Sequence, residues 1–186
     1  DIINFDLSVK NRDATDDKIT IDAANKIKKI GIGIKCATIT PDDKRVREFK
    51  LKRKYPSPNG TIRNILQGTI FREPLICKNI PKIVPHWNKP VIIARHAFGD
   101  IYKARDFRVK KGSIVNIEII DIVGKNERKE VHKFTSDGIA LGMLNEDQSI
   151  RNFARSCFLY ALDKEISLFL STKNTILQNY DERFKE

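Results

Sequence analysis

The stretch IGIKCATITPDDKR (residues 32–45) predicts a strand followed by a helix, the repeating unit of an α/β fold. Residues 32–40 are mostly apolar or β-branched, as in a strand. Pro41 suits the first helical position and Thr40 the N-cap, while Asp42 and Asp43 suit the positive end of the helix dipole. The sequence therefore predicts a helix that begins at Pro41.

The residues before this stretch repeat the same order of elements. Ile3, Phe5 and Leu7 alternate with polar residues as in a half-buried strand, and a polar turn, NRDATDD (residues 11–17), follows. Apolar residues at helical spacing then predict a helix over about residues 16–29, with Gly31 as its C-cap.

Prolines dominate the next segment, because six of the seven lie between residues 55 and 90. Loops with one short helix, TIRNIL (residues 61–66) ending near Gly68, are expected there. The apolar run 91–94 then predicts a buried strand that delivers Arg95 and His96 at its end, where α/β proteins build their sites. We expect His96 to make a structural hydrogen bond and assign it no catalytic role.

The pattern changes to β between residues 101 and 135. Val115, Ile117 and Ile119 alternate with polar residues, GKNER (residues 124–128) supplies a turn, and a return strand follows, which predicts an antiparallel pair. Such a pair is marginal alone, so we expect it to pack on the same pair of another subunit. An amphipathic helix is expected from about Asp147, then a strand over ISLFL (residues 166–170), and a helix from Asn174.

The balance of charge, 35 Lys and Arg against 24 Asp and Glu, gives a formal net charge of +11. The basic residues concentrate at positions 44–54 and 103–111, so a basic nucleic-acid-binding module is an alternative interpretation. That alternative depends on charge alone, because no zinc spacing, aromatic RNA-binding motif or helix-turn-helix signature accompanies the clusters. No apolar run approaches the ~20 residues that cross a bilayer, and three distant cysteines indicate free thiols.

Polar and cationic side chains lie where the predicted elements end. If these ends converge, they form a pocket with three arginines, a lysine, hydroxyls and a helix N-terminus, which suits a small anion with several carboxylates. The three arginines are Arg63, Arg72 and Arg95, the lysine is Lys173, and the other residues at element ends are Thr40, Arg45, Ser57 and Asn59.

Five segments together resemble a known enzyme family. They are KCATITPDDKR (35–45), SPNGTIRNIL (57–66), GTIFREP with ICKNIP (68–81), RHAFGDIY (95–102), and LSTKNTIL with YDERFK (170–185). In this order they closely resemble the NADP-dependent isocitrate dehydrogenases of the eukaryotic homodimeric type. The resemblance covers the whole chain. It implies a piece of that enzyme that lacks the first strand, the first helix and everything after about the midpoint.

The resemblance implies oxidation of isocitrate with NADP, followed by loss of carbon dioxide with Mg²⁺ or Mn²⁺ to give 2-oxoglutarate. Tyr102 would protonate the enolate, and Lys173 would assist deprotonation of the substrate hydroxyl from the neighbouring subunit. Substrate contacts would come from Thr40, Ser57, Pro58, Asn59, Gly60, Thr61, Ile62, Arg63, Arg72 and Arg95. NADP contacts would come from Thr38, Ile39, Thr40 and Arg45. The metal-binding aspartates are expected outside this segment, so no residue of it is assigned to the metal.

The resemblance also implies the domain organisation of an isocitrate/isopropylmalate dehydrogenase-like α/β fold. Residues 1–66 would form part of a large domain, residues 67–99 and 147–186 part of a small α/β domain, and residues 100–146 an antiparallel β clasp that joins two subunits. We expect a homodimer, no nucleic-acid or membrane partner, and a mitochondrial or cytoplasmic location. An inactive remnant that only dimerises is a further alternative.

Overall fold

The computed structural model describes residues 1–186, which form two compact units. Unit 1 comprises Asp1–Phe98 and Asn145–Glu186, and unit 2 comprises Gly99–Leu144. The elements of unit 1 are α1 (Val9–Ala14), α2 (Lys18–Ile30), α3 (Asp43–Glu48), α4 (Pro58–Leu66), β1 (Thr69–Arg72), β2 (Ile93–His96), α6 (Asp147–Asp163) and α7 (Glu182–Lys185). Those of unit 2 are α5 (Asp100–Lys103), β3 (Arg105–Val109), β4 (Ile114–Ile120), β5 (Asn126–Lys133) and β6 (Gly138–Gly142). The fold is a mixed α/β fold with small antiparallel sheets.

Helix α2 packs against α4 in the N-terminal part of unit 1. The predicted helix and its cap are confirmed, because Gly31 adopts a left-handed φ of 89° and its N–H donates to the carbonyl of Ile27. The predicted amphipathic helix from Asp147 is confirmed as α6. None of the helices combines the length and apolar character needed to cross a bilayer. The buried side chains of the α2–α4 pair are Thr20, Ala23 and Ala24 of α2 and Pro58 and Ile62 of α4.

Three predicted strands are wrong, because residues 3–7, 32–40 and 166–170 form no strand. A strand satisfies its backbone N–H and C=O groups through a neighbouring strand, and no strand lies alongside these runs. Their apolar side chains are correspondingly open to solvent, with Ile34 94% and Phe169 88% exposed. These three runs therefore have the apolar sequence pattern of a strand, but no strand among residues 1–186 forms hydrogen bonds with them.

Several predicted boundaries also need correction. Helix α3 begins at Asp43 and is capped by Asp42, whose carboxylate accepts the N–H of Arg45 at 2.8 Å, so Thr40 is not the N-cap. The NRDATDD segment forms helix α1 and its exit instead of a simple turn. At the C-terminus the helix is only α7, and it begins at Glu182 instead of Asn174.

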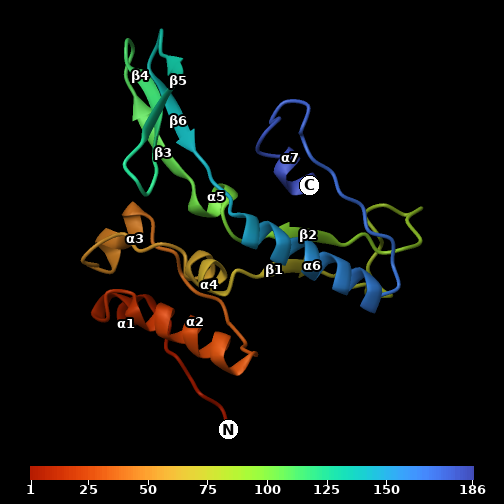
Figure 1. Ribbon diagram of the computed structural model, residues 1–186. Coiled ribbons are helices and arrows are strands. Elements are labelled where there is room, and N and C mark those ends of the chain that lie inside the picture. Colours follow the sequence, from red (N-terminus) through yellow and green to blue (C-terminus); the bar gives the residue numbers. More distant parts are fainter. The chain divides into compact units, whose positions relative to one another are not determined.

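Strands β1 and β2 form an antiparallel ribbon that α6 covers on one face (Figure 1). The register pairs Ile70 with Arg95 and Phe71 with Ala94. Phe71 stacks on Tyr160 of α6, with ring centroids 4.1 Å apart. Burial and a hydrogen bond to Glu73 raise the pKa of Tyr160 to about 12. Strand β2 is half-exposed, so the prediction of a buried strand at residues 91–94 is wrong.

Unit 2 consists of a short helix and two antiparallel strand pairs, β3–β6 and β4–β5. The predicted pair across GKNER is confirmed as β4–β5, where the Asp121 carboxylate accepts the backbone N–H groups of Val123 and Lys125. Large apolar side chains of its strands stay exposed, including Phe107, Ile117 and Ile139. These strands therefore form ladders without a core of their own.

Candidate active site

The β1–β2 register places Arg72 and Arg95 on one face of the ribbon. Arg72 lies opposite Ile93 and Arg95 opposite Ile70, and alternate residues of a strand share a face. The two arginines are therefore diagonal neighbours, with backbones about 7 to 8 Å apart, within reach of one small anion. Phe71 and His96 lie on the other face, where they contact α6.

Contacts with α6 and α7 hold His96, the residue that follows Arg95 in β2. His96 Nε2 hydrogen-bonds the buried Ser149 Oγ at 2.8 Å, which confirms the prediction that His96 has a structural role. The rings of Phe153 and Phe184 lie 5.1 and 5.5 Å from the His96 ring. Ala97 and Phe98, which follow, are buried. Arg95 thus protrudes from a strand that is fixed on its opposite face.

A second cationic group lies in the loop before α3. Lys35 Nζ donates to Thr38 Oγ1 and to the carbonyl of Cys36, each at 2.9 Å. Burial lowers the pKa of Lys35, and the positive charges of Arg63 and Arg12 lower it further against the opposing effect of Cys36. Lys35 and Arg63 therefore repel each other, and an anion bound beside them would relieve that repulsion. Sequence reasoning missed Lys35, although it lies only three residues before the predicted site residue Thr38.

Helix α4 carries most of the predicted substrate contacts. Ser57 is its N-cap and Pro58 its first residue, and the Ser57 side chain makes no capping bond. Pro58 and Ile62 are buried, so their side chains serve packing. Asn59 is exposed, whereas Ser57, Gly60 and Thr61 are half-buried and remain accessible at the positive end of the helix. Arg63 is half-buried in the last turn of the helix.

The remaining predicted residues are placed separately. Thr40 and Ile39 are exposed in the loop before α3, and Arg45 is exposed on α3 itself. Tyr102 belongs to α5 of unit 2. Lys173 is exposed in an irregular segment, where its backbone N–H donates to Asp181 Oδ2 at 2.5 Å. Convergence of Arg63, Arg72 and Arg95 in one pocket stays a prediction.

The sequence profile of the isocitrate/isopropylmalate dehydrogenases matches residues 1–186. The chain belongs to this family. It is 54% identical over 186 residues to an isocitrate dehydrogenase (NADP) of Sphingobium yanoikuyae, which covers 100% of this chain and 46% of that enzyme. It is 55% identical over 183 residues to the mitochondrial enzyme of Sus scrofa (98% of this chain, 44% of the enzyme) and 55% identical over 184 residues to the cytoplasmic enzyme of Dictyostelium discoideum (98% and 45%). The chain spans under half the length of these relatives.

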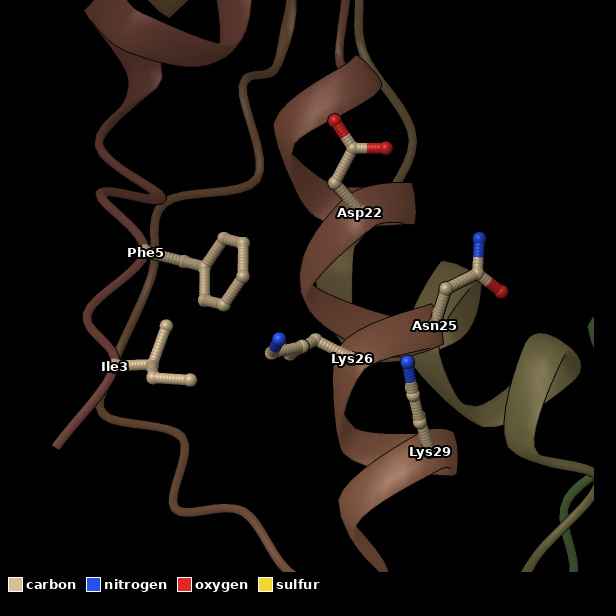
Figure 2. Close-up of a pocket in the computed structure, with 6 residues that line it drawn as sticks. All are labelled: Ile3, Phe5, Asp22, Asn25, Lys26 and Lys29. Carbon is tan, nitrogen blue, oxygen red and sulfur yellow. The ribbon is translucent and has the colours of Figure 1, made fainter. Parts of the chain in front are cut away.

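Possible metal ligands and the pocket of the chain were compared with the predicted site residues. No group of three or more His, Cys, Asp or Glu side chains that could hold a metal ion is present among residues 1–186. A pocket of about 420 Å³ lies between the N-terminal segment and α2 (Figure 2). None of the predicted site residues lines it, and we assign it no role in catalysis. Its lining residues are Ile3, Phe5, Asp22, Asn25, Lys26 and Lys29.

Substitution of Ser149 tests the anchor behind Arg95. We expect Ser149→Ala to destabilise the protein by about 1 to 3 kcal/mol, because the partly buried His96 ring loses its hydrogen-bond partner. Thermal unfolding of the complete protein measures this effect. Ser156→Ala is the matched control, because that hydroxyl bonds only the Asn152 carbonyl of its own helix, at 2.8 Å. Equal destabilisation by the two variants would contradict an anchoring role for Ser149.

Proposed function

We propose that this chain forms part of an NADP-dependent isocitrate dehydrogenase that converts isocitrate to 2-oxoglutarate and carbon dioxide. The observation that carries the proposal is the pair Arg72 and Arg95 on one ribbon face, in a chain about 55% identical to enzymes named for this activity. Arginine binds a carboxylate through two parallel N–H groups, so two adjacent arginines match a substrate with several carboxylates.

The binding roles follow from the chemistry of the side chains. Arg63, Arg72 and Arg95 bind the carboxylates of isocitrate. Polar groups at the positive end of α4 contact the same anion. They belong to Ser57, Asn59, Gly60 and Thr61, and Pro58 and Ile62 shape this segment by packing. Thr38, Ile39, Thr40 and Arg45 provide hydroxyl, backbone and guanidinium groups for NADP, which accepts the hydride from the substrate when bound.

Two side chains move protons in the proposed reaction. Lys173 of a neighbouring subunit takes the proton of the substrate hydroxyl as the hydride leaves. After loss of carbon dioxide, Tyr102 donates a proton to the enolate carbon, which completes 2-oxoglutarate.

Unit 2 serves as the dimerisation clasp in this proposal. Its boundaries, Gly99–Leu144, lie close to the expected clasp, and its exposed apolar side chains suit a surface covered by a second copy. We further propose that residues 1–66 belong to a large domain and residues 67–99 and 147–186 to a small one. A mitochondrial or cytoplasmic location accords with the named relatives.

Nothing specific favours the nucleic-acid alternative. Several cations of the first basic cluster bond acidic residues or backbone carbonyls of the chain itself. Lys52 Nζ donates to the backbone carbonyl of Asp13 at 3.0 Å, and Lys54 Nζ pairs with the Asp43 carboxylate at 3.2 Å. These contacts compete with phosphates for the same cations.

The proposed function is tested by mixing the complete protein with isocitrate, NADP and Mg²⁺ or Mn²⁺ and following NADPH absorbance. We expect reduction of NADP with isocitrate and little with 3-isopropylmalate, because the latter replaces a carboxylate by an apolar group and leaves one arginine of the site without a carboxylate partner. Preference for 3-isopropylmalate, or no turnover of either acid, would show that the proposal is wrong.

A further inference from the structure

Arg12 of α1 is the only arginine whose side chain is completely buried. Its Nε donates to Asp17 Oδ1 at 2.7 Å and its Nη2 to Asp17 Oδ2 at 3.2 Å. The same guanidinium also donates to two distant backbone carbonyls. Nη1 reaches the carbonyl of Ile39 at 3.2 Å, and Nη2 reaches the carbonyl of Pro56 at 2.8 Å. One planar group thus joins three segments of unit 1.

The turn that supplies Asp17 is shaped to hold this carboxylate in place. Asp16 and Asp17 both adopt left-handed backbone conformations, with φ of 50° and 67°. Non-glycine residues keep such conformations where the surroundings determine them closely. The hydroxyl of Thr20 donates to Asp17 Oδ1 at 2.6 Å, and the N–H of Asp17 donates to the carbonyl of Arg12 at 2.7 Å. The carboxylate therefore holds the guanidinium in one orientation.

The two carbonyls that Arg12 holds belong to the two loops that carry the proposed ligand contacts. Ile39 lies between Thr38 and Thr40, which we assign to NADP and substrate. Pro56 precedes Ser57, the N-cap of α4 and the first of the proposed substrate residues. Arg12 donates to both loops and is therefore a direct polar link between the two binding segments.

We propose that Arg12 is a positioning residue that holds the loop 38–40 and the start of α4 in register for simultaneous binding of NADP and isocitrate. This inference rests on the proposed function for its kinetic part only, because the link between the loops is independent of what they bind. Arg12 touches neither ligand and acts through backbone carbonyls. A lysine cannot replace it, since one ammonium cannot reach Asp17 and both carbonyls as the planar fork does.

The test uses the complete protein with Arg12→Lys, which keeps a charge for Asp17 and loses the fork. We expect KM to rise about tenfold for both isocitrate and NADP, because both loops are released together. We also expect amide hydrogen exchange to quicken roughly fivefold in peptides covering residues 36–46 and 55–63. The matched control is Arg53→Lys. Arg53 also bonds this turn, at the carbonyl of Asp16, and its guanidinium lies 5.1 Å from the centroid of the Tyr55 ring, but it bonds neither the Ile39 nor the Pro56 carbonyl.

A second variant tests the same role if Arg12→Lys does not fold. Arg12→Met combined with Asp17→Asn removes both buried charges, so no unpaired charge is left inside the protein. We expect it to fold and to show the same changes in KM and in exchange.

Unchanged KM values and unchanged exchange in the folded variants, a response of one loop alone, or an equal response to Arg53→Lys would overturn the positioning role. If the wild-type protein does not oxidise isocitrate, the proposed function is wrong, and the exchange measurement still decides whether Arg12 links the loops.

Discussion

Replacement of Lys173 by methionine is expected to lower kcat of the complete enzyme at least about a hundredfold. The reason is that general acid–base catalysis by a positioned side chain contributes ~10² to 10⁴ in rate, and methionine keeps the length of the side chain without a titratable group. Lys173 is exposed, and its hydrogen bonds within the chain come from its backbone, whose N–H donates to Asp181 and whose carbonyl accepts from Ile176 and Leu177. Its side chain is therefore available to a neighbouring subunit. Steady-state kinetics with isocitrate and NADP measure the loss.

Mixed dimers show whether Lys173 acts across the subunit boundary. When Lys173→Met and Arg95→His subunits are co-expressed, random pairing makes half of the dimers mixed, and each mixed dimer has one site with both residues intact. We therefore expect about a quarter of wild-type activity from the mixture. Activity no greater than the average of the two variants would indicate that Lys173 serves the site of its own subunit, or that the enzyme is not a dimer.

Replacement of Arg95 by histidine is expected to lower kcat/KM for isocitrate at least about tenfold. A charged hydrogen bond contributes ~1.5 to 3 kcal/mol, and the shorter ring cannot span the carboxylate as the guanidinium does. Arg95 owes its rigidity to the ribbon, because its partner Ile70 and its neighbour His96 are both held in place.

The ligand dependence of this effect separates a specific clamp from a general anion contact. Binding of 2-oxoglutarate, which has one carboxylate fewer, is expected to weaken less than binding of isocitrate in Arg95→His. Arg105→His is the matched control, since Arg105 is an exposed strand arginine without a proposed ligand role. Equal losses for the two ligands would contradict assignment of Arg95 to the carboxylate that only isocitrate carries.

Helices and hairpins were the elements that the sequence could predict. Helix α2, helix α6 and the β4–β5 pair depend on residues a few positions apart, so periodicity and turn residues identify them. The runs 3–7, 32–40 and 166–170 have the apolar character of strands but no neighbour to pair with. A single-sequence pattern cannot report whether such a neighbour exists.

The candidate site could likewise be predicted from the sequence only in part, because its geometry depends on residues that are far apart in the chain. The motifs named Arg72 and Arg95 as candidate ligand residues, whereas their shared face follows from a register that joins residues far apart in the chain. Arg12 was read as part of a polar turn, because its role depends on carbonyls 27 and 44 positions away. Only the folded chain brings those atoms together.

The strands of unit 2 are paired yet leave Phe107, Ile117 and Ile139 exposed. If a second copy covers these side chains, as we propose, much of the folding free energy of the unit comes from that contact. For such a segment, folding and association are one equilibrium. Its melting temperature then rises with the concentration of whatever covers it. Dilution alone would then unfold this segment without any change of temperature or solvent, and Tyr102 of α5, the proton donor that we propose, would be lost with it.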